Sequence, residues 1–312
     1  MTPSYLTRLL LLSSASFFVV LMFLAALVAW IAPAAIRRTS AMGPRRAARW
    51  LLTLRLLPAA LSAIVVAALC VPSYLRFEPH ATNEEAGAVS LTAAILGAAI
   101  CALAIYRGST ALLRSALYLR RAGGRDSTVN GEKVRIVGDG AGLALAGIMH
   151  PRLLISERAI AGLSSDELAA ALRHERAHGE SRDNLKRLLI QLAPAIFSGL
   201  RTLEHEWVKR AEWAADDQAT EGNAERSAAL ASALVRVARL QNCAAMPALV
   251  TSLVSADEDL ELRVDRLLDR PKDAEPPNRR FETIALASAA LLIGGLAMNL
   301  RLVHVLLETL LD

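Results

Sequence analysis

The chain has 312 residues, of which 54% are hydrophobic, and a mean hydropathy of +0.36. This composition is too apolar for an ordinary soluble domain of this length and indicates a membrane protein. The net charge of +5 does not indicate nucleic-acid binding, because aromatic residues make up only 4% of the chain and several basic residues flank apolar runs. We therefore expect the lipid bilayer, and not nucleic acid, as a partner.

Three apolar runs in the first third of the chain are long enough to cross a bilayer as helices: about residues 9–32, 50–75 and 86–106. Five arginines follow the first run between residues 37 and 49, whereas the loop after the second run contains Glu78, Glu84 and Glu85. Because loops rich in arginine and lysine stay in the cytoplasm, we expect the N-terminus outside the cell and the chain after residue 106 inside it.

A further apolar run at about residues 281–300 predicts a fourth transmembrane helix, followed by a short external tail. These predictions divide the chain into a membrane domain at 1–106, a cytoplasmic domain at 107–280 and a C-terminal segment at 281–312. The expected protein is thus a multi-pass protein of the cell membrane, mainly α-helical, with one cytoplasmic domain.

The cytoplasmic domain is predicted to contain a polar, glycine-containing break at residues 120–131, followed by a small sheet. Short apolar or β-branched stretches separated by glycine or proline predict its strands, at residues 133–137, 143–147 and 152–156. An edge strand of this sheet could bind an extended peptide substrate as one more strand. The alternative is that the sheet only supports the helix that follows it.

That next helix carries the strongest motif of the chain, His174-Glu175-Arg176-Ala177-His178. Ser164 and Glu167 predict its start, because a serine followed three residues later by a glutamate forms a capping box. Residues four apart share one face of a helix, so both imidazoles can bind one tetrahedral Zn²⁺. Glu175 points to another side of the helix and is available as a general base toward water.

Four more helices are predicted after Gly179. An apolar helix at 186–203 is interrupted by Pro194 and lies either in the domain core or against the membrane. A polar helix at 204–222, a packing helix at 224–240 and an amphipathic helix at 258–270 follow.

The polar helix at 204–222 offers a third metal ligand, Glu212, because a catalytic zinc site with two histidines needs one more protein ligand and leaves the fourth position to water. Asp216 follows one turn later on the same face and can accept a hydrogen bond from a ligand imidazole. Glu204, His205 and Glu206 compete for the ligand role but are expected to be solvated. The cysteines, Cys70, Cys101 and Cys243, lack C-x-x-C spacing and predict neither a disulfide framework nor a metal site.

Several separated motifs, taken in order, resemble membrane zinc peptidases of the BlaR/MecR family. They are Gly147 to Ile155, Leu163 to Leu168, the motif around Glu175, Asp183-Asn184-Leu185, Glu212-x-x-Ala215-Asp216, and Leu260 to Val264. The glutamate and aspartate of the fifth motif are also similar to those of HtpX-type proteases. The resemblance covers most of residues 134–270 and the order of three spans, peptidase and one span.

The resemblance implies a gluzincin-like α+β metallopeptidase domain in the cytoplasm. It implies that His174, His178 and Glu212 bind zinc and that Glu175 is the base. It also implies that Asp216 accepts a hydrogen bond from a ligand imidazole. Antibiotic receptors of this family carry a large penicillin-binding sensor after the last span, whereas only residues 301–312 follow it here. Direct antibiotic sensing is therefore not expected, and a separate sensor partner or a homo-oligomer could supply a signal.

Two classes of function remain open. The first is a zinc endopeptidase that cleaves a cytoplasmic or membrane-associated protein, either a regulatory protein such as a transcriptional repressor or, as in HtpX-type proteases, a quality-control substrate. The second is a non-catalytic membrane receptor or scaffold with structural zinc. Because structural sites are usually closed by four protein ligands and the sequence offers three obvious ones, it favours catalysis.

Overall fold

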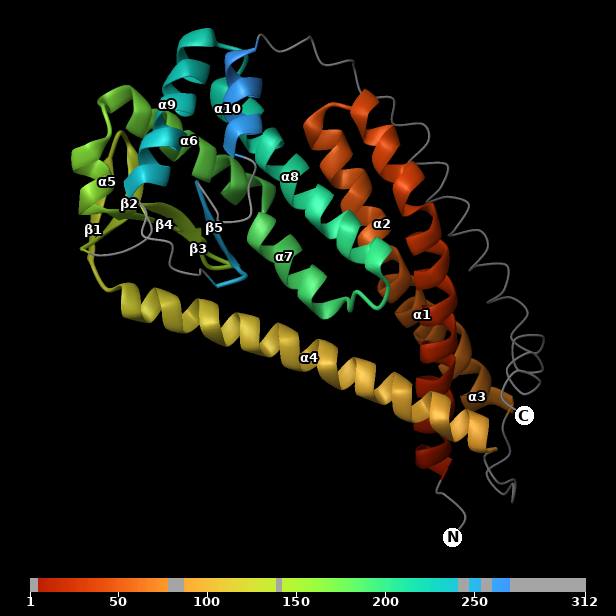
Figure 1. The fold of residues 1–312 in the computed structure, drawn as a ribbon. Helices are drawn as coiled ribbons and strands as arrows, with labels where there is room; N and C mark the ends of the chain where they lie inside the picture. The colour runs from red at the N-terminus through yellow and green to blue at the C-terminus, as the bar shows by residue number, and fades with distance from the viewer. Residues whose placement is uncertain (1–4, 78–86, 139–141, 241–246, 254–259, 270–312) are drawn as a thin grey trace.

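The computed structural model describes residues 5–77, 87–138, 142–240, 247–253 and 260–269 (Figure 1). Long helices form one side of the molecule, and a small sheet with shorter helices forms the other. The predicted fourth span at 281–300 and its tail lie outside the described residues.

Within the described residues, three continuous helical segments are long and apolar enough to cross a membrane. They consist of α1 (Tyr5–Arg38), of α2 (Pro44–Val65) followed by a π-helical turn (Val66–Cys70) and α3 (Val71–Phe77), and of α4 (Ala88–Ala122). The helical, membrane-type character predicted for this region is confirmed, whereas the direction in which the helices cross stays a prediction. Each segment is longer than its predicted span, and α4 continues without a break past residue 106.

Five short strands form one mixed sheet in the order β1-β2-β4-β3-β5. Strands β2 and β4 are parallel, and the other neighbours are antiparallel. The strands are β1 (Arg125–Val129), β2 (Glu132–Val137), β3 (Leu143–Ala146), β4 (Arg152–Ser156) and β5 (Val250–Ser252). The three predicted strands are thus confirmed as β2, β3 and β4.

The prediction of a break at residues 120–131 is wrong, because α4 runs to Ala122 and β1 begins at Arg125. Strand β1 is polar because it lies at a sheet edge and is largely exposed. Asn130 and Gly131 both have positive φ, as a two-residue hairpin turn requires, and join β1 to β2. Strand β5 was not predicted, and it pairs with the outer edge of β3.

Six helices follow the first four strands: α5 (Glu157–Gly162), α6 (Ser165–Ser181), α7 (Asp183–Leu192), α8 (Ser198–Thr220), α9 (Ala224–Leu240) and α10 (Leu260–Leu268). The capping box of Ser164 and Glu167 at the start of α6 is confirmed. The predicted boundary between helices at residues 203 and 204 is wrong. The chain instead leaves the helix before Pro194, which disfavours helical geometry at the preceding residue, and α8 is continuous from Ser198.

The sheet is covered on both faces. On one face Ile136, Leu145 and Ile155 pack with apolar residues of α6 and α9 in the largest apolar core. On the other face Tyr118 and Leu119, near the end of α4, pack against β3, β4 and β5. Helix α6 therefore lies directly on the sheet, with its motif facing α8.

Helix α8 joins the membrane-type helices to the domain that contains the sheet. Leu200, Leu203 and Trp207 share an apolar core with residues of α1 and α2. The guanidinium of Arg55, buried in α2, donates to Glu204 Oε2 at 3.1 Å and to the Ala193 carbonyl at 2.7 Å. The expectation that Glu204 is solvated is therefore wrong, because its carboxylate is the counter-ion of Arg55.

The Arg55 contacts predict a measurable coupling between α2 and α8. Arg55→Leu should lower the free energy of unfolding by about 2–3 kcal/mol, because it leaves a partly buried carboxylate and a carbonyl without a donor. Urea unfolding in detergent micelles measures this loss. Arg55→Leu combined with Glu204→Leu should recover at least part of the stability, whereas simple addition of the two single losses would contradict the pairing.

Candidate metal centre

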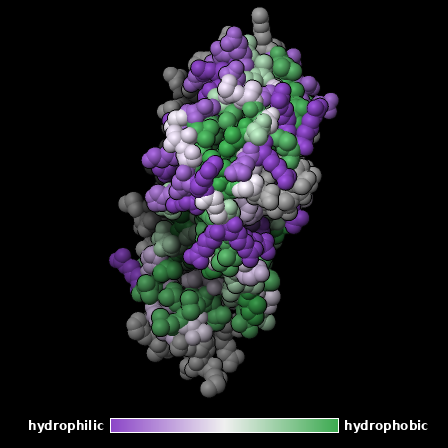
Figure 2. Space-filling model, turned by 90° about the vertical axis from the view of Figure 1, so that its left-hand side faces the viewer, coloured by the Kyte–Doolittle hydropathy of each residue, from purple (hydrophilic) through white to green (hydrophobic). Residues whose placement is uncertain are grey.

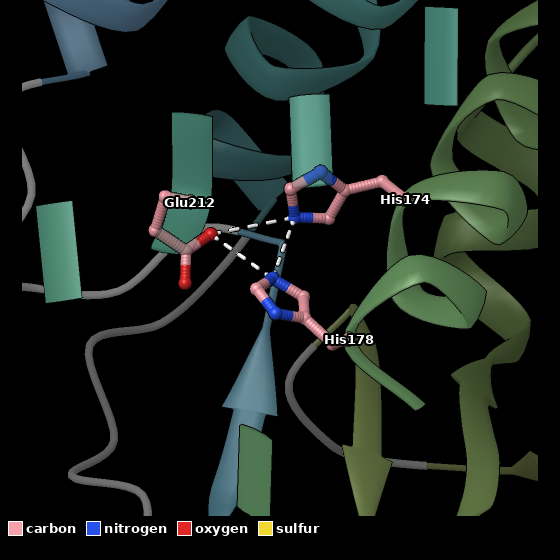
Figure 3. Close-up of side chains that lie close together, drawn as sticks. All are labelled: His174, His178 and Glu212. Carbon is pink, nitrogen blue, oxygen red and sulfur yellow. Dashed lines mark hydrogen bonds and ion pairs between the residues drawn. The ribbon is translucent and has the colours of Figure 1, made fainter. Parts of the chain in front are cut away.

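Three donor atoms from two helices converge inside the domain (Figure 3). The Nε2 atoms of His174 and His178 on α6 lie 3.1 Å apart. Oε2 of Glu212 on α8 lies 3.2 Å from Nε2 of His178 and 3.4 Å from Nε2 of His174. All three side chains are buried. The structure therefore brings together the three residues that the sequence proposed as metal ligands.

The spacing of these atoms fits a metal ion. Ligands that bind a tetrahedral ion such as Zn²⁺ at about 2.0–2.2 Å lie about 3.3–3.6 Å from one another. The three observed distances differ from this range by at most a few tenths of an ångström. Among the described residues this is the one group of histidine, cysteine or acidic side chains that could hold a metal ion.

Each imidazole has a carboxylate behind it. Nδ1 of His178 lies 2.7 Å from Oδ2 of Asp183, and Nδ1 of His174 lies 3.0 Å from Oδ1 of Asp216. A carboxylate at Nδ1 favours the proton on that nitrogen and leaves Nε2 as the metal-binding atom. Asp216 thus has the position that the sequence predicted for it.

The role of Asp183 was not predicted. Its side chain reaches His178 because Arg182 adopts a left-handed conformation, with φ of 54°, between α6 and α7. Lys186 donates to the other oxygen of Asp183 at 2.7 Å. An aspartate five residues after the second histidine was a visible signal, but only the turn at Arg182 shows that the two side chains meet.

Arg263 on α10 is a second residue whose role was missed. It is buried and binds both oxygens of Asp216, at 2.8 and 3.0 Å, and it also donates to the Leu253 carbonyl. Its guanidinium lies 3.5 Å from Oε2 of Glu212. Arg263 therefore holds Asp216 in place and compensates the charge of both buried carboxylates. An arginine on the buried side of an amphipathic helix was the available signal.

Glu175 differs from the other acids of the site. It is fully buried, and neither carboxylate oxygen has a hydrogen-bond partner among the described residues. Burial raises the pKa of Glu175 to about 7, against the opposing effect of His174 and His178. A carboxyl group with this pKa exchanges protons readily at neutral pH.

The alternative ligands are not part of this group. Glu204 binds Arg55, and His205 is exposed. Cys70 and Cys101 lie in the membrane-type helices, and Cys243 lies outside the described residues.

Comparison with known protein families found no matching family model, and comparison with characterised proteins found no match either. Any functional assignment therefore depends on the residues and geometry of the chain itself.

The carboxylates behind the imidazoles should set the metal affinity. Asp183→Asn and Asp216→Asn should each weaken metal binding by about 10–100-fold, the usual cost of losing such a partner. Competition with a chelating indicator measures the affinity. Asp217→Asn is the matched control, because Asp217 pairs with Arg266 and not with a histidine. Equal affinities for all three variants would contradict the role of Asp183 and Asp216.

Metal binding should also depend on pH. In the metal-free site burial lowers the pKa of His178, but Glu212 and Asp183 outweigh this effect and raise the pKa well above its usual value. Bound protons therefore stabilise the metal-free protein. This contribution is complete below about pH 6.5, the pKa of an unfolded histidine, and is lost as the pH rises through the folded pKa.

At neutral pH a metal ion must therefore displace a proton from His178. We therefore expect at least about one proton to be released per metal ion bound. The affinity for the metal should fall as the pH falls. Calorimetric titrations in two buffers of different ionisation enthalpy count these protons. A release of zero, together with an affinity that is independent of pH around neutrality, would show that the imidazole is already free of its proton.

Proposed function

We propose that this protein is a membrane-bound, zinc-dependent endopeptidase. The observation that carries the proposal is the combination of a buried donor set of two imidazoles and one carboxylate with the unpartnered buried carboxyl group of Glu175 on the same helix. The resemblance to BlaR/MecR-type peptidases, noted in the sequence, supports the same reading.

Zinc is the metal that this donor set fits best. Two imidazole nitrogens and one carboxylate oxygen are the ligands of known catalytic zinc sites. Bound zinc would lower the pKa of a water molecule toward neutrality and polarise the carbonyl group of a peptide. His174, His178 and Glu212 would hold the ion, and the carboxylates of Asp183 and Asp216 would orient the two imidazoles.

Glu175 would move the protons of the reaction. Its carboxylate can accept a proton from the attacking water and can then give that proton to the leaving amine nitrogen. No described side chain occupies its two oxygens by a hydrogen bond, so neither oxygen has to give up a protein partner when water and substrate enter the site.

The alternative, a receptor or scaffold with structural zinc, is less well supported. A structural zinc ion is usually enclosed by four protein ligands, and the described residues provide three. A buried carboxyl group without a hydrogen-bond partner is costly to keep in a site that does no chemistry.

Solvent exclusion at the site supports a regulated protease over a constantly active one. His174, Glu175 and His178 have no exposed surface, so a peptide can reach them only after part of the chain moves. The sequence predicted that an edge strand of the sheet could bind a peptide; β1 and β5 are the edge strands, and β3 is paired with β5. A substrate strand would have to bind at the outer edge of β1 or β5, or displace β5. We propose a cytoplasmic or membrane-associated regulatory protein as substrate, with quality control of membrane proteins as the alternative.

The proposed role of Glu175 predicts that Glu175→Gln keeps its metal but loses cleavage by at least about 100-fold, since a positioned proton-transfer group contributes about 10²–10⁴-fold. Metal analysis of the purified protein and comparison of new protein N-termini in cells expressing either form measure the two effects. Glu180→Gln is the matched control, because Glu180 lies on the same helix and is exposed.

Two outcomes would contradict the proposal. Cleavage by Glu175→Gln at the wild-type rate would exclude Glu175 as the proton-transfer group. The same set of N-termini in cells expressing wild type, Glu175→Gln or no protein would favour the receptor or scaffold.

A further inference from the structure

A surface outside the metal centre combines exposed apolar side chains with many cations. It begins on α4 after Tyr106, where the predicted span ended. Leu112, Leu113 and Leu117 are exposed there. The opposite side of the same turns is buried, and a side chain at Gly108 would collide with Leu192 of α7. Helix α4 therefore rests on the domain with one side and presents leucines on the other.

The charge of α4 is of one sign. The helix contains four arginines and no acidic residue: Arg107, Arg114, Arg120 and Arg121. Three of them, Arg114, Arg120 and Arg121, are exposed. Arginine near the end of an apolar helix extends its charge toward lipid headgroups while its stem stays in apolar surroundings.

The neighbouring part of the sheet continues this positive charge. Arg135 and Leu154 are partners in the β2–β4 register, and Leu154 packs in the apolar cluster under α4, so Arg135 is on the sheet face that α4 covers. Lys133 and Arg152 lie two residues earlier on their strands and share that face. The side chains of Tyr118 and Leu119 pack against the β3, β4 and β5 part of this face.

The part of this face toward β1 borders an open cavity of about 490 Å³. Lys133, Arg135 and Arg152 line it, together with one acid, Asp126. Asp126 pairs with Arg135 at 2.8 Å, and the nearby cations lower its pKa. The charged lining thus comprises three cations and one anion, which suits a negatively charged ligand.

An apolar loop tip lies next to this cavity. Met149, between β3 and β4, is 82% exposed, the largest exposure among the large hydrophobic side chains described. Gly147 of the same loop lies against Leu119 of α4, since a Cβ there would be 3.6 Å from the leucine Cδ1. The loop, the last turns of α4 and the cavity are therefore neighbours.

We infer that this basic apolar surface binds the anionic phospholipid headgroups of the bilayer that the spans cross. The surface consists of the exposed side of α4 from Leu112 to Arg121, Met149, and the cavity lined by Lys133, Arg135 and Arg152. Its continuity with an apolar helix long enough to cross a membrane identifies the occupant as a membrane rather than a soluble anion.

The surface of the molecule agrees with this arrangement. In Figure 2 the lower part of the face is mainly hydrophobic, and hydrophilic side chains begin directly above it. Cations at such a border are attracted to anionic lipids, and exposed leucine and methionine side chains can enter the headgroup region. Through α4, which packs under the sheet, lipid binding would hold the domain against the bilayer.

Site-specific quenching tests this inference on the full chain. A fluorophore attached at Met149→Cys, in a background without Cys70, Cys101 and Cys243, reports contact with lipids that carry a quencher. In nanodiscs of phosphatidylcholine mixed with phosphatidylglycerol, quenching should be at least about twofold stronger than in phosphatidylcholine alone. Lys133→Glu combined with Arg152→Glu should abolish the difference.

The matched control reverses two charges on α9, which packs on the opposite face of the sheet: Arg226→Glu with Arg239→Glu should keep the difference. Zinc binding that persists in a variant shows that the variant is folded. If the variant with Lys133→Glu and Arg152→Glu does not fold, Lys133→Gln combined with Arg152→Gln provides a milder change. Equal quenching in both kinds of nanodisc, weak or strong, would overturn the inference. So would a fluorescence change produced in phosphatidylcholine discs by inorganic phosphate alone, which would identify a soluble anion as the ligand.

Discussion

The candidate metal centre depends on one continuous helix, α8, whose first half is fixed against the membrane-type helices. Near its start Gly199 approaches α1 so closely that a Cβ would lie 2.6 Å from the Ala29 carbonyl oxygen. Leu203 and Trp207 then pack between α1 and α2, and Glu204 binds Arg55. From there to Glu212 is about 12 Å along a rigid helix. The membrane helices and the donor oxygen of Glu212 therefore belong to one packed unit.

The electrostatics of the centre follow from burial. Three buried carboxylates, Asp183, Glu212 and Asp216, each lie beside a histidine and a cation, and charges that are paired and hydrogen-bonded in this way can be kept inside a domain. The pKa of Asp216 falls to about 2, because the Arg263 guanidinium and His174 outweigh the effect of burial. Glu175 is the exception, because it is buried without such a partner and its pKa rises instead. This contrast separates the acids that hold the site from the one suited to proton transfer.

The parts that could be predicted from the sequence are those encoded by local periodicity. The capping box and the four-residue spacing of His174 and His178 lie within one helix, and so do Glu212 and Asp216 on α8. The meeting of these two helices was proposed from chemistry and resemblance, and the structure brings the donors together. The apolar runs likewise predicted three membrane-type helices, although not their full length.

The parts that were missed depend on contacts between distant segments. Arg263 reaches Asp216 across 47 residues, and β5 pairs with a strand more than 100 residues earlier. Asp183 meets His178 only because Arg182 adopts a left-handed turn, for which the arginine itself gives no signal. Helix α4 was expected to end where charge begins, but three of its four arginines lie on the outside of a helix whose other side is buried by the domain.

The central claim is that two imidazoles and one carboxylate hold a zinc ion whose fourth position is open. X-ray absorption spectroscopy at the zinc edge, on the purified full chain, tests it most directly. The account predicts one zinc per chain, four ligands at about 2.0–2.2 Å, all nitrogen or oxygen, with a small anion able to replace one of them. A sulfur ligand, four protein ligands that no anion displaces, or a chain that binds no zinc would contradict it.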